Sequence, residues 1–401
     1  MNAVGSSSLN KRVAVLGSTG SIGTSTLSVI SHLGEPYRAV ALSAHRQGKL
    51  LLEQVRKYRP AAVAVTDEKC CNEIQAQLTA LGAQVYCGAD ALVDMVRRDD
   101  VDIVLVAIVG SAGLPAVLAA IESGKTLALA NKEALVVAGS LVIPLARKLG
   151  VPILPVDSEH SAVFQAMRCG KAAEIKRVIL TASGGPFRNA TREQMETATL
   201  SDALNHPTWK MGNKISIDSA TMFNKGLELI EACWLFDIPP EKVEIVIHPE
   251  SVVHSMVEYV DGSVIAQLSP PDMRTPIQYA LTYPHRREGS TRKLDLLKAF
   301  ALHFEPPDHG RFPALKLAYA VARKGGTYGA VLNGANEAAV AAFAKGRICF
   351  GQIARVVERT IESHKAVAMP GLGDLIEADR WARETAEQAI IRQDRVVQGV
   401  H

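Results

Sequence analysis

Hydrophobic residues in the first part of the chain occur in short unbroken runs, separated by longer segments in which they recur every three or four positions. An unbroken run suits a strand covered on both faces, as in a parallel sheet, and the longer spacing suits an amphipathic helix. This alternation predicts a doubly wound, Rossmann-like α/β domain over residues 1–157. We expect helices such as 115–123 and 134–149 between strands at 12–16, 39–44, 61–66, 84–87, 102–109, 126–130 and 153–156.

The pattern changes near residue 158, where glycines, prolines and polar residues crowd together. The runs 243–247, 255–259 and 263–268 alternate between apolar and polar residues, and Asp261-Gly262 suits a hairpin turn between the last two. We therefore expect residues 158–284 to form a central α+β domain with a mainly antiparallel sheet.

The last part of the chain has helical character. Residues 285–313 are charged and contain prolines, which predicts a linker. The segments 335–344, 349–364 and 378–397 show alanine-rich or helical patterns with charged outer faces, so residues 314–401 are expected to form a C-terminal helical bundle. A chain of 401 residues has room for this three-part organisation.

Composition narrows the class of protein. The 44 basic and 41 acidic side chains nearly balance, which argues against a nucleic-acid partner. The apolar run 134–146 is too short to span a membrane, and residues 1–12 lack the apolar core of a secretory signal. We expect a cytoplasmic protein whose six cysteines are reduced and mostly buried: Cys70, Cys71, Cys87, Cys169, Cys233 and Cys349.

A glycine-rich loop follows the first predicted strand. It reads Gly17-Ser-Thr-Gly-Ser-Ile-Gly and precedes a predicted helix that extends through Leu33. Glycines let the backbone approach a pyrophosphate, and the helix start offers unpaired N–H groups. The spacing is GxxGxxG rather than GxGxxG, so an ordinary strand–helix turn is the alternative.

The end of the second predicted strand bears on which dinucleotide would bind. An NAD site has an acidic residue there for the ribose 2′-hydroxyl, but this chain has His45-Arg46-Gln47 and no acidic residue before Glu53. A guanidinium suits a 2′-phosphate, so the sequence favours NADPH over NADH. The alternative is that Arg46 starts a solvated helix.

Two polar clusters are candidates for chemistry. Asp157 and Glu159 flank Ser158 after the last strand of the first domain, and with Glu228 they offer hard oxygen ligands for Mg²⁺ or Mn²⁺, although such pairs are also common on surfaces. The second cluster suits an anion such as phosphate, because a Ser-Gly-Gly turn exposes backbone N–H groups near further donors. Its members are Ser183, Gly184 and Gly185, with Ser219, Asn224 and Lys225 and with charge from His206 and Lys132; helix capping by Ser219 and Asn224 is the alternative.

An ordered set of motifs spans nearly the whole chain and closely resembles the 1-deoxy-D-xylulose 5-phosphate reductoisomerase family. The motifs are Gly17-Ser-Thr-Gly-Ser-Ile-Gly, Ala130-Asn-Lys-Glu-Ala-Leu, Pro155-Val-Asp-Ser-Glu-His, Ala182-Ser-Gly-Gly-Pro-Phe, His206-Pro-Thr-Trp-Lys-Met-Gly, Asp218-Ser-Ala-Thr-Met-Phe-Asn-Lys-Gly-Leu-Glu, His248-Pro-Glu-Ser-Val-Val-His-Ser-Met-Val and Asn333-Gly-Ala-Asn-Glu-Ala. Phe223 and Glu250, where the family often has Met and Gln, are small departures.

The resemblance implies a metal-dependent enzyme that rearranges 1-deoxy-D-xylulose 5-phosphate and reduces the intermediate with NADPH to 2-C-methyl-D-erythritol 4-phosphate, in the non-mevalonate route to isoprenoids. Residues 158–284 would then be the catalytic domain and residues 1–157 the NADPH-binding domain. A homodimer is implied by the family and by the exposed strand edges expected in the middle domain.

The resemblance also implies roles for individual residues. It makes Asp157, Glu159 and Glu228 metal ligands and catalytic residues, with Lys132 as a further catalytic group. The implied substrate contacts are Lys132, Ser158, Glu159, Ser183, His206, Ser219, Asn224, Lys225 and Glu228. The implied cofactor contacts are Thr19, Gly20, Ser21, Ile22, Asn131, Glu133 and Gly212, with His45, Arg46 and Gln47 near the 2′-phosphate, where this chain differs in detail from the family.

The aldehyde intermediate has to be kept from water, so we expect a lid over residues 205–213, with Trp209 as its apolar cover or else as a packing residue. Two rival functions remain. A semialdehyde dehydrogenase would need an activated cysteine, and Cys169 and Cys233 are expected in buried helices. A dinucleotide-sensing regulator would lack a metal ligand or a phosphate anchor, and none is missing.

Overall fold

The computed structural model describes residues 11–209, 211–298 and 300–398, and side chains are described as far as Ile391. This chain divides into two compact units. Each unit is made of stretches that are separated in the sequence. Unit 1 comprises the chain up to residue 131 together with 144–157 and 272–291. Unit 2 comprises residues 132–143, 158–271 and the chain from residue 292 onward.

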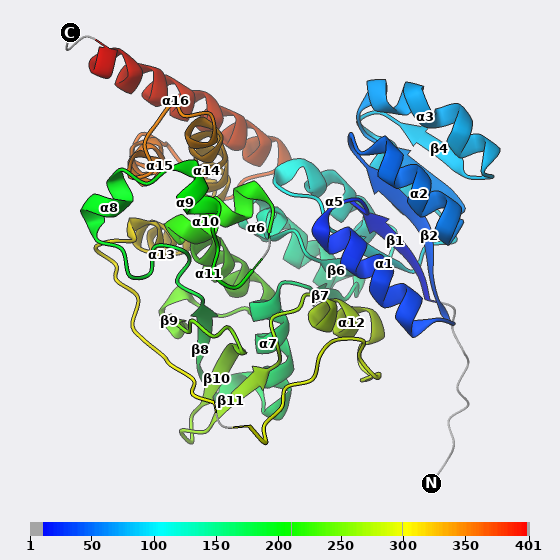
Figure 1. Ribbon diagram of the computed structural model, residues 1–401, viewed down its shortest axis with the longest axis horizontal. Helices are drawn as coiled ribbons and strands as arrows, with labels where there is room; N and C mark the ends of the chain where they lie inside the picture. Colours follow the sequence, from blue (N-terminus) through cyan, green and yellow to red (C-terminus); the bar gives the residue numbers. More distant parts are fainter. Residues whose placement is uncertain (1–10, 210, 299, 399–401) are drawn as a thin grey trace. The chain divides into compact units, whose positions relative to one another are not determined.

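Unit 1 contains a parallel sheet with the strand order β4-β3-β2-β1-β5-β6-β7 (Figure 1). The order reverses beside β1, as in doubly wound folds, so the predicted fold class is confirmed. The strands are β1 (Lys11–Leu16), β2 (Tyr37–Ala44), β3 (Ala62–Val65), β4 (Gln84–Cys87), β5 (Ile103–Val106), β6 (Thr126–Leu129) and β7 (Ile153–Pro155). Central strands such as β3 and β5 are buried throughout, which is why their sequences are unbroken apolar runs.

Helices connect these strands in the expected alternation. They are α1 (Ser21–Leu33), α2 (Gly48–Tyr58), α3 (Glu68–Ala80), α4 (Ala91–Val96) and α5 (Leu114–Glu122), with a 3₁₀ turn η1 (Ser111–Gly113) before α5. Helix α12 (Arg274–Thr282) also packs in this unit, against α1, β6 and β7. Helix α6 (Lys132–Leu149) is interrupted at Ala138 and contains Pro144, and the division between the units falls just before that proline.

Unit 2 contains a second sheet with the order β11-β10-β8-β9. Its strands are β8 (Ile175–Ala182), β9 (Val243–Ile247), β10 (Val253–Tyr259) and β11 (Val264–Leu268). Only β8 and β9 pair in parallel, so the predicted mainly antiparallel sheet is confirmed. The Asp261-Gly262 turn joins β10 to β11, with Gly262 at a φ of 86° and the Asp261 carboxylate accepting from the Ser263 N–H.

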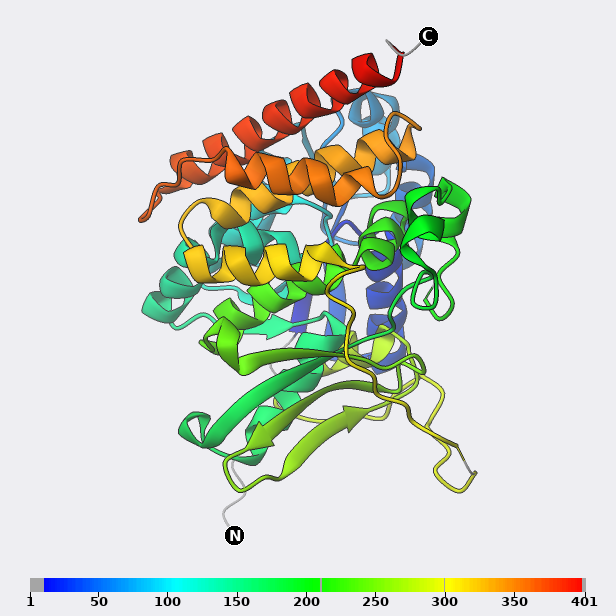
Figure 2. The ribbon, with the colours of Figure 1, turned by 90° about the vertical axis from the view of Figure 1, so that its left-hand side faces the viewer.

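Helices make up the rest of unit 2. Figure 2 shows α13 to α16, in yellow, orange and red, lying one above another, and this agrees with the predicted helical C-terminal region. The helices are α7 (Ser158–Ala166), α8 (Arg192–Glu196), α9 (Leu200–Leu204), α10 (Asn213–Thr221), α11 (Phe223–Phe236), α13 (Pro313–Lys324), α14 (Tyr328–Ala344), α15 (Gln352–Glu362) and α16 (Leu372–Gln398), with 3₁₀ turns η2 (Met167–Cys169), η3 (Ala172–Glu174) and η4 (Pro240–Lys242).

Small residues let the C-terminal helices pack closely. Helix α14 lies against α15 and α16, and a Cβ at Gly334 would come within 2.6 Å of the Asp379 carbonyl oxygen. In the predicted linker, the described residues form no helix before α13, and Glu305 pairs with Ile247 at the end of β9. The compact units do not follow the boundaries 157, 284 and 313, which describe functional domains and stay a prediction.

No helix among the described residues is long and apolar enough to cross a membrane. The expectation for residues 1–12 lies almost wholly outside the described part of the chain.

The cysteine prediction is wrong in two respects. Cys71 and Cys87 form a disulfide, because α3 packs back along β4 and brings their Cα atoms to 5.9 Å, which the sequence spacing does not reveal. Cys169 is exposed in the short turn η2 and Cys233 is only half-buried, so they do not lie in two buried helices, and Cys349 is exposed as well. Burial nevertheless raises the pKa of Cys233 to about 12, which keeps that thiol protonated near neutral pH.

Candidate active site

The glycine loop of unit 1 has a conformation that its glycines require. Gly17 has a φ of 80°, and a Cβ there would lie 2.7 Å from the Ala107 carbonyl oxygen. A Cβ at Gly23 would lie 2.2 Å from the Gly17 carbonyl oxygen. Both positions therefore exclude larger side chains, and the backbone stays open where α1 begins.

The predicted cofactor contacts of unit 1 gather at the carboxyl ends of neighbouring strands. Thr19 to Ile22 cover the start of α1, with Gly20 as its N-cap. The Gly17 N–H donates to the Ser43 hydroxyl at 2.8 Å, which ties the loop to the end of β2. Asn131 donates to the carbonyl oxygens of Ile108 and Gly110 at 2.6 and 2.9 Å. This edge of the sheet is where doubly wound folds bind nucleotides.

The three residues predicted near a 2′-phosphate follow β2. Helix α2 starts at Gly48 with Gln47 as its N-cap, so Arg46 precedes the helix and does not start it. The side chain of Arg46 is 76% exposed, and its Nε donates to Asp67 Oδ2 at 3.0 Å. His45 Nδ1 lies 2.9 Å from Thr66 Oγ1. Two hydrogen bonds lower the pKa of the Asp67 carboxyl. The larger effect comes from the Cys70 N–H and the smaller one from Arg46.

The three predicted metal ligands come together where α7 begins. Asp157 is bonded to Ser158, the first residue of α7, Glu159 follows, and Glu228 lies on α11. One carboxylate oxygen from each residue lies within 4.8 Å of the other two. Three convergent hard oxygens match the donor set of Mg²⁺ or Mn²⁺, so these residues fit a divalent cation.

Two lysines pair with carboxylates of this cluster. Lys132 Nζ donates to Glu228 Oε1 at 2.9 Å and to Asn224 Oδ1 at 2.9 Å. Lys225 Nζ donates to Glu159 Oε1 at 2.7 Å and also contacts Glu228 Oε2. Burial opposes the charge on Lys225, but the two carboxylates outweigh it and raise the pKa of Lys225. Lys225, expected among the phosphate anchors, thus lies with the carboxylates.

Sequence reasoning missed two buried residues behind this cluster. His160 Nε2 donates to the Glu228 carbonyl oxygen at 2.8 Å, and its Nδ1 lies 3.1 Å from Glu231 Oε2. Both side chains are fully buried. His160 and Glu231 follow Asp157 and Glu228 at a spacing of three, which is one helical turn and is the signal that could have found them.

The predicted anion cluster forms around the Ser183-Gly184-Gly185 turn. Ser183 Oγ accepts from the Gly185 N–H at 3.2 Å and lies 3.0 Å from His206 Nε2. His206 Nδ1 accepts from two backbone N–H groups, so Nε2 carries the hydrogen and donates to Ser183. Because the Gly185 N–H and His206 Nε2 both donate to the Ser183 oxygen, the hydroxyl hydrogen of Ser183 remains available for an anion. Burial lowers the pKa of His206, which favours the neutral ring.

The turn also packs against α10. A Cβ at Gly185 would lie 2.7 Å from the Ser219 carbonyl oxygen, so the turn and Ser219 are neighbours. Ser219 lies inside α10, and Asn224 is the second residue of α11, whose N-cap is Met222. Neither residue occupies a cap position, so the capping alternative is wrong.

The remaining predicted residues lie at helix starts of unit 2. Glu133 is the second residue of α6, is buried, and accepts from Lys214 Nζ at 2.6 Å. Gly212 is the N-cap of α10. Lys210, inside the predicted lid, is outside the described residues, whereas Trp209 is half-buried with its ring 6.4 Å from that of His254.

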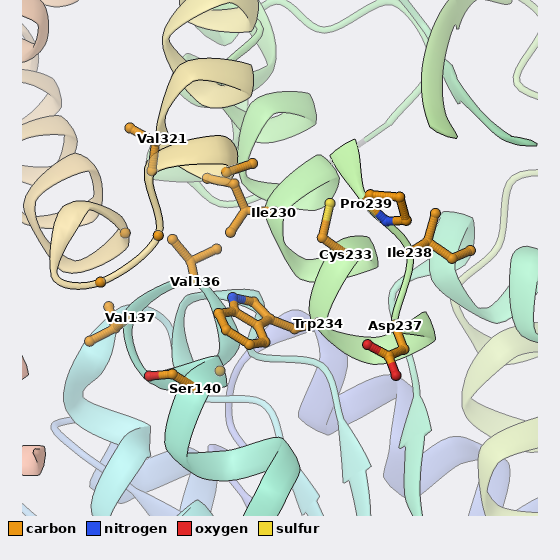
Figure 3. A pocket seen from close by; sticks show the side chains of 15 residues that line it. Val136, Val137, Ser140, Ile230, Cys233, Trp234, Asp237, Ile238, Pro239 and Val321 are labelled. Atoms are coloured by element: carbon orange, nitrogen blue, oxygen red, sulfur yellow. The ribbon is translucent and has the colours of Figure 1, made fainter. Parts of the chain in front are cut away.

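A separate apolar cavity of about 340 Å³ lies in unit 2 between α6, α11 and α13 (Figure 3). The indole of Trp234 forms one wall and fills the space beside Gly139, where a Cβ would lie 2.4 Å from the ring. None of the predicted site residues lines this cavity, so it is distinct from the carboxylate cluster.

Three family models match the chain. The model described as 1-deoxy-D-xylulose 5-phosphate reductoisomerase matches residues 13–139, and the two models of its C-terminal domains match residues 153–236 and 268–385. Curated reductoisomerases of this name are similar over almost their whole length. The protein from Pelodictyon phaeoclathratiforme is 51% identical over 95% of this chain and 100% of its own, and that from Geobacter sp. is 50% identical over 95% and 99%.

Solved structures agree with this result. The reductoisomerase from Zymomonas mobilis in complex with NADPH has a TM-score of 0.89 and 46% identity, covering 95% of this chain and 99% of its own. A reductoisomerase in complex with NADPH, fosmidomycin and magnesium has a TM-score of 0.88 and 42% identity, covering 95% and 98%. With its motifs, its fold and its relatives in agreement, the chain belongs to the 1-deoxy-D-xylulose 5-phosphate reductoisomerase family.

Proposed function

We propose that this chain converts 1-deoxy-D-xylulose 5-phosphate to 2-C-methyl-D-erythritol 4-phosphate, with NADPH as reductant and a divalent metal ion as cofactor, in the formation of isoprenoid precursors. The observation that carries the proposal is the cluster of Asp157, Glu159 and Glu228, with Lys132 paired to Glu228. Relatives of this family have been solved with NADPH and with magnesium, which supports both cofactors.

The metal ion is Mg²⁺ or Mn²⁺, and Asp157, Glu159 and Glu228 would hold it. When bound, such an ion stabilises negative charge that develops on the oxygens of a hydroxyketone as a carbon–carbon bond breaks and reforms. Lys225 places positive charge beside Glu159 and Glu228, which offsets part of the repulsion between these carboxylates.

The chain's own side chains would bind and orient the substrate. Lys132 lies at the carboxylate cluster and can hold or move a proton at its Nζ, and Ser158 contacts Glu159 beside it. Ser183, His206 and Ser219 would bind the phosphate at the far end. Anchoring that end converts remote binding energy into orientation of the reacting carbons.

NADPH would supply the hydride that reduces the aldehyde. The residues that would contact it are Thr19, Gly20, Ser21, Ile22, Asn131, Glu133 and Gly212. The open backbone around Gly17 supports a close approach of the pyrophosphate, because larger side chains are excluded there.

The test is oxidation of NADPH by the purified chain with 1-deoxy-D-xylulose 5-phosphate, followed at 340 nm and by identification of the product. We expect turnover that EDTA abolishes and that Mg²⁺ or Mn²⁺ restores. Turnover that persists in EDTA would exclude the metal role, and absence of turnover with either ion would reject the reaction.

Replacement of Arg46 by Asp is expected to shift the preference from NADPH toward NADH by about 100-fold, because a carboxylate repels a 2′-phosphate and can accept from a 2′-hydroxyl. The ratio of kcat/KM for the two cofactors measures it. Arg56 is an exposed arginine on α2, and Arg56→Asp is the matched control that should leave the ratio unchanged. An unaltered ratio in Arg46→Asp would remove Arg46 from the 2′-phosphate site.

We further propose that residues 205–213 close over the bound substrate, with Trp209 excluding water from the aldehyde. Trp209 is half-buried, and its backbone N–H donates to Nδ1 of His206, one of the proposed phosphate anchors. Trp209→Ala is expected to raise KM and lower kcat together, by about tenfold each. Steady-state kinetics with a thermal melt as control checks this, and an enzyme with unchanged constants would leave Trp209 as a packing residue.

A homodimer is proposed from the free edge of the second sheet. Strand β11 is one of the two edge strands, and Val264 and Leu268 on it are 47% and 39% exposed. Exposed apolar strand edges favour pairing with another chain. Sedimentation of the wild type and of Val264→Lys tests the proposal, with a monomeric wild type as the contrary result.

We also propose that the protein acts in the cytoplasm. Four of its six cysteines are free thiols, which is typical of a reducing compartment, whereas the Cys71–Cys87 disulfide counts against it. Fractionation of cells that produce it, followed by detection of the protein, is the direct test.

A further inference from the structure

Lys214 lies among carboxylates outside the proposed metal and phosphate sites. It is the second residue of α10, and its Nζ is 2.6 Å from Glu133 Oε1 and 3.0 Å from Asp218 Oδ2. The side chains of Glu133 and Asp218 are 7% and 1% exposed. A lysine held between two buried carboxylates is part of a built charge cluster rather than a surface ion pair.

The same cluster extends into the C-terminal helices. Asn336 on α14 donates from Nδ2 to Asp218 Oδ1 at 2.8 Å, so α14 holds the other side of the Asp218 carboxylate. Glu337, the next residue, contributes to the positive shift of the Lys214 pKa and is itself paired with Arg383 of α16 at 2.9 Å. Side chains of α14 and α16 therefore help to define the charge around Lys214.

Glu133 connects this cluster to the proposed active site. It follows Lys132 directly, and the two residues begin α6. Lys132 Nζ lies 2.9 Å from Glu228 Oε1, while Glu133 is fixed by Lys214 in the same turn. A shift of Glu133 would therefore shift the backbone from which Lys132 reaches the carboxylates.

The energetic balance makes Lys214 hard to replace. Burial disfavours the ionised form of Glu133, but the neighbouring lysine charge outweighs it and lowers the pKa of Glu133. Without Lys214, the buried carboxylates of Glu133 and Asp218 would lose the cation that contacts both of them, and a proton or water would have to compensate. Entry of a proton or of water would shift Glu133 and, with it, the first turn of α6.

We propose that Lys214 is a positioning residue for Lys132: clamped between Glu133 and Asp218, it fixes the first turn of α6 and so sets where the Lys132 ammonium meets the substrate. The C-terminal helices contribute through Asn336, which fixes Asp218. This inference rests on the proposed function, because Lys132 is assigned to the reacting end of the substrate.

The first test compares Lys214→Met with Lys214→Arg. Methionine keeps the length and loses the charge, so kcat is expected to fall about 100-fold, as misplaced catalytic groups do. Arginine keeps the charge and should retain kcat within about fivefold. The matched control is Lys176→Met, which removes a lysine paired with Glu258 at 2.7 Å elsewhere in unit 2 and should leave kcat unchanged.

The decisive measurement is the same substitution in a Lys132→Met background. If Lys214 acts through Lys132, then Lys214→Met should lower the residual kcat of that background by less than about twofold. A further 100-fold loss in that background, or an unchanged kcat in the single variant, overturns the proposal. Failure of the wild type to use the substrate would instead reject the proposed function, so the two failures are distinguishable.

A second variant covers the case in which Lys214→Met does not fold. Asp218→Asn keeps the shape of the side chain and its contact with Asn336, but it removes one of the two charges that fix Lys214. We expect kcat to fall about fivefold with a melting temperature close to that of the wild type, and this loss should also disappear in the Lys132→Met background. A loss that persists there contradicts the proposal.

Discussion

Replacing Glu228 with glutamine is expected to lower kcat about 1000-fold while the Kd for NADPH changes less than about threefold, a loss of about 4 kcal/mol in transition-state stabilisation. Glu228 is 1% exposed and faces Lys132, Asn224 and Lys225 with its two oxygens. Glutamine removes one negative charge and turns an amide N–H₂ toward an ammonium group. The divalent ion loses a ligand, and Lys132 loses the partner that holds it at the reacting end.

Kinetics over a series of Mg²⁺ concentrations measures this effect, with NADPH binding followed by fluorescence. Excess Mg²⁺ should restore part of the activity if the substitution weakens the metal site. Glu244→Gln is the matched control, because Glu244 pairs with Arg177 at 2.6 Å on the exposed side of unit 2. Normal turnover of Glu228→Gln at ordinary Mg²⁺ concentration would take Glu228 out of the metal site.

The strands of the first domain were predictable because burial on both faces leaves a direct mark on the sequence. Strand β5 has only apolar residues and is buried throughout, and its neighbours β1 and β6 are buried and apolar from Val13 and Leu127 onward. Strand β8 escaped prediction because it combines an unbroken apolar run with charged residues at Lys176 and Arg177, which pair with Glu258 across the sheet. Its identity as a strand depends on partners distant in the sequence.

Contacts between distant segments were the least predictable part of the fold. Helix α12 comes after the second sheet in the sequence but packs against α1 in unit 1. The Cys71–Cys87 disulfide depends on the way α3 returns along β4. Neither arrangement leaves a periodic signal, because each arises from tertiary packing rather than from a local pattern.

For the candidate site, residue types were predictable and pairings were not. The carboxylates Asp157, Glu159 and Glu228 were expected together and lie together. Lys225 pairs with them and does not extend the anion cluster around Ser183, because Glu228 lies one turn later on α11. For Lys214 the sequence offers only the local i,i+4 pairing with Asp218 on α10, because Glu133 meets it only after folding.

Replacing Gly185 with alanine is expected to lower kcat/KM for the sugar phosphate about 100-fold, mainly through KM, with NADPH affinity unchanged. Gly185 has a φ of 65°, and a Cβ there would lie 2.7 Å from the Ser219 carbonyl oxygen. Backbone has to move to relieve such a contact, so the turn would separate from α10. The Ser183 hydroxyl would then no longer converge with Ser219 on one phosphate.

The left-handed backbone alone also disfavours alanine, by about 1 kcal/mol, so the experiment has to separate strain from the loss of the anion site. Gly262→Ala provides this control. Gly262 has a φ of 86° in the hairpin turn of the same unit, but a Cβ there would meet nothing within 4 Å. Both variants should therefore lose thermal stability, whereas only Gly185→Ala should raise KM. Equal kinetic effects from the two substitutions would show that Gly185 matters for folding and not for phosphate binding, because the control lacks only the contact with α10.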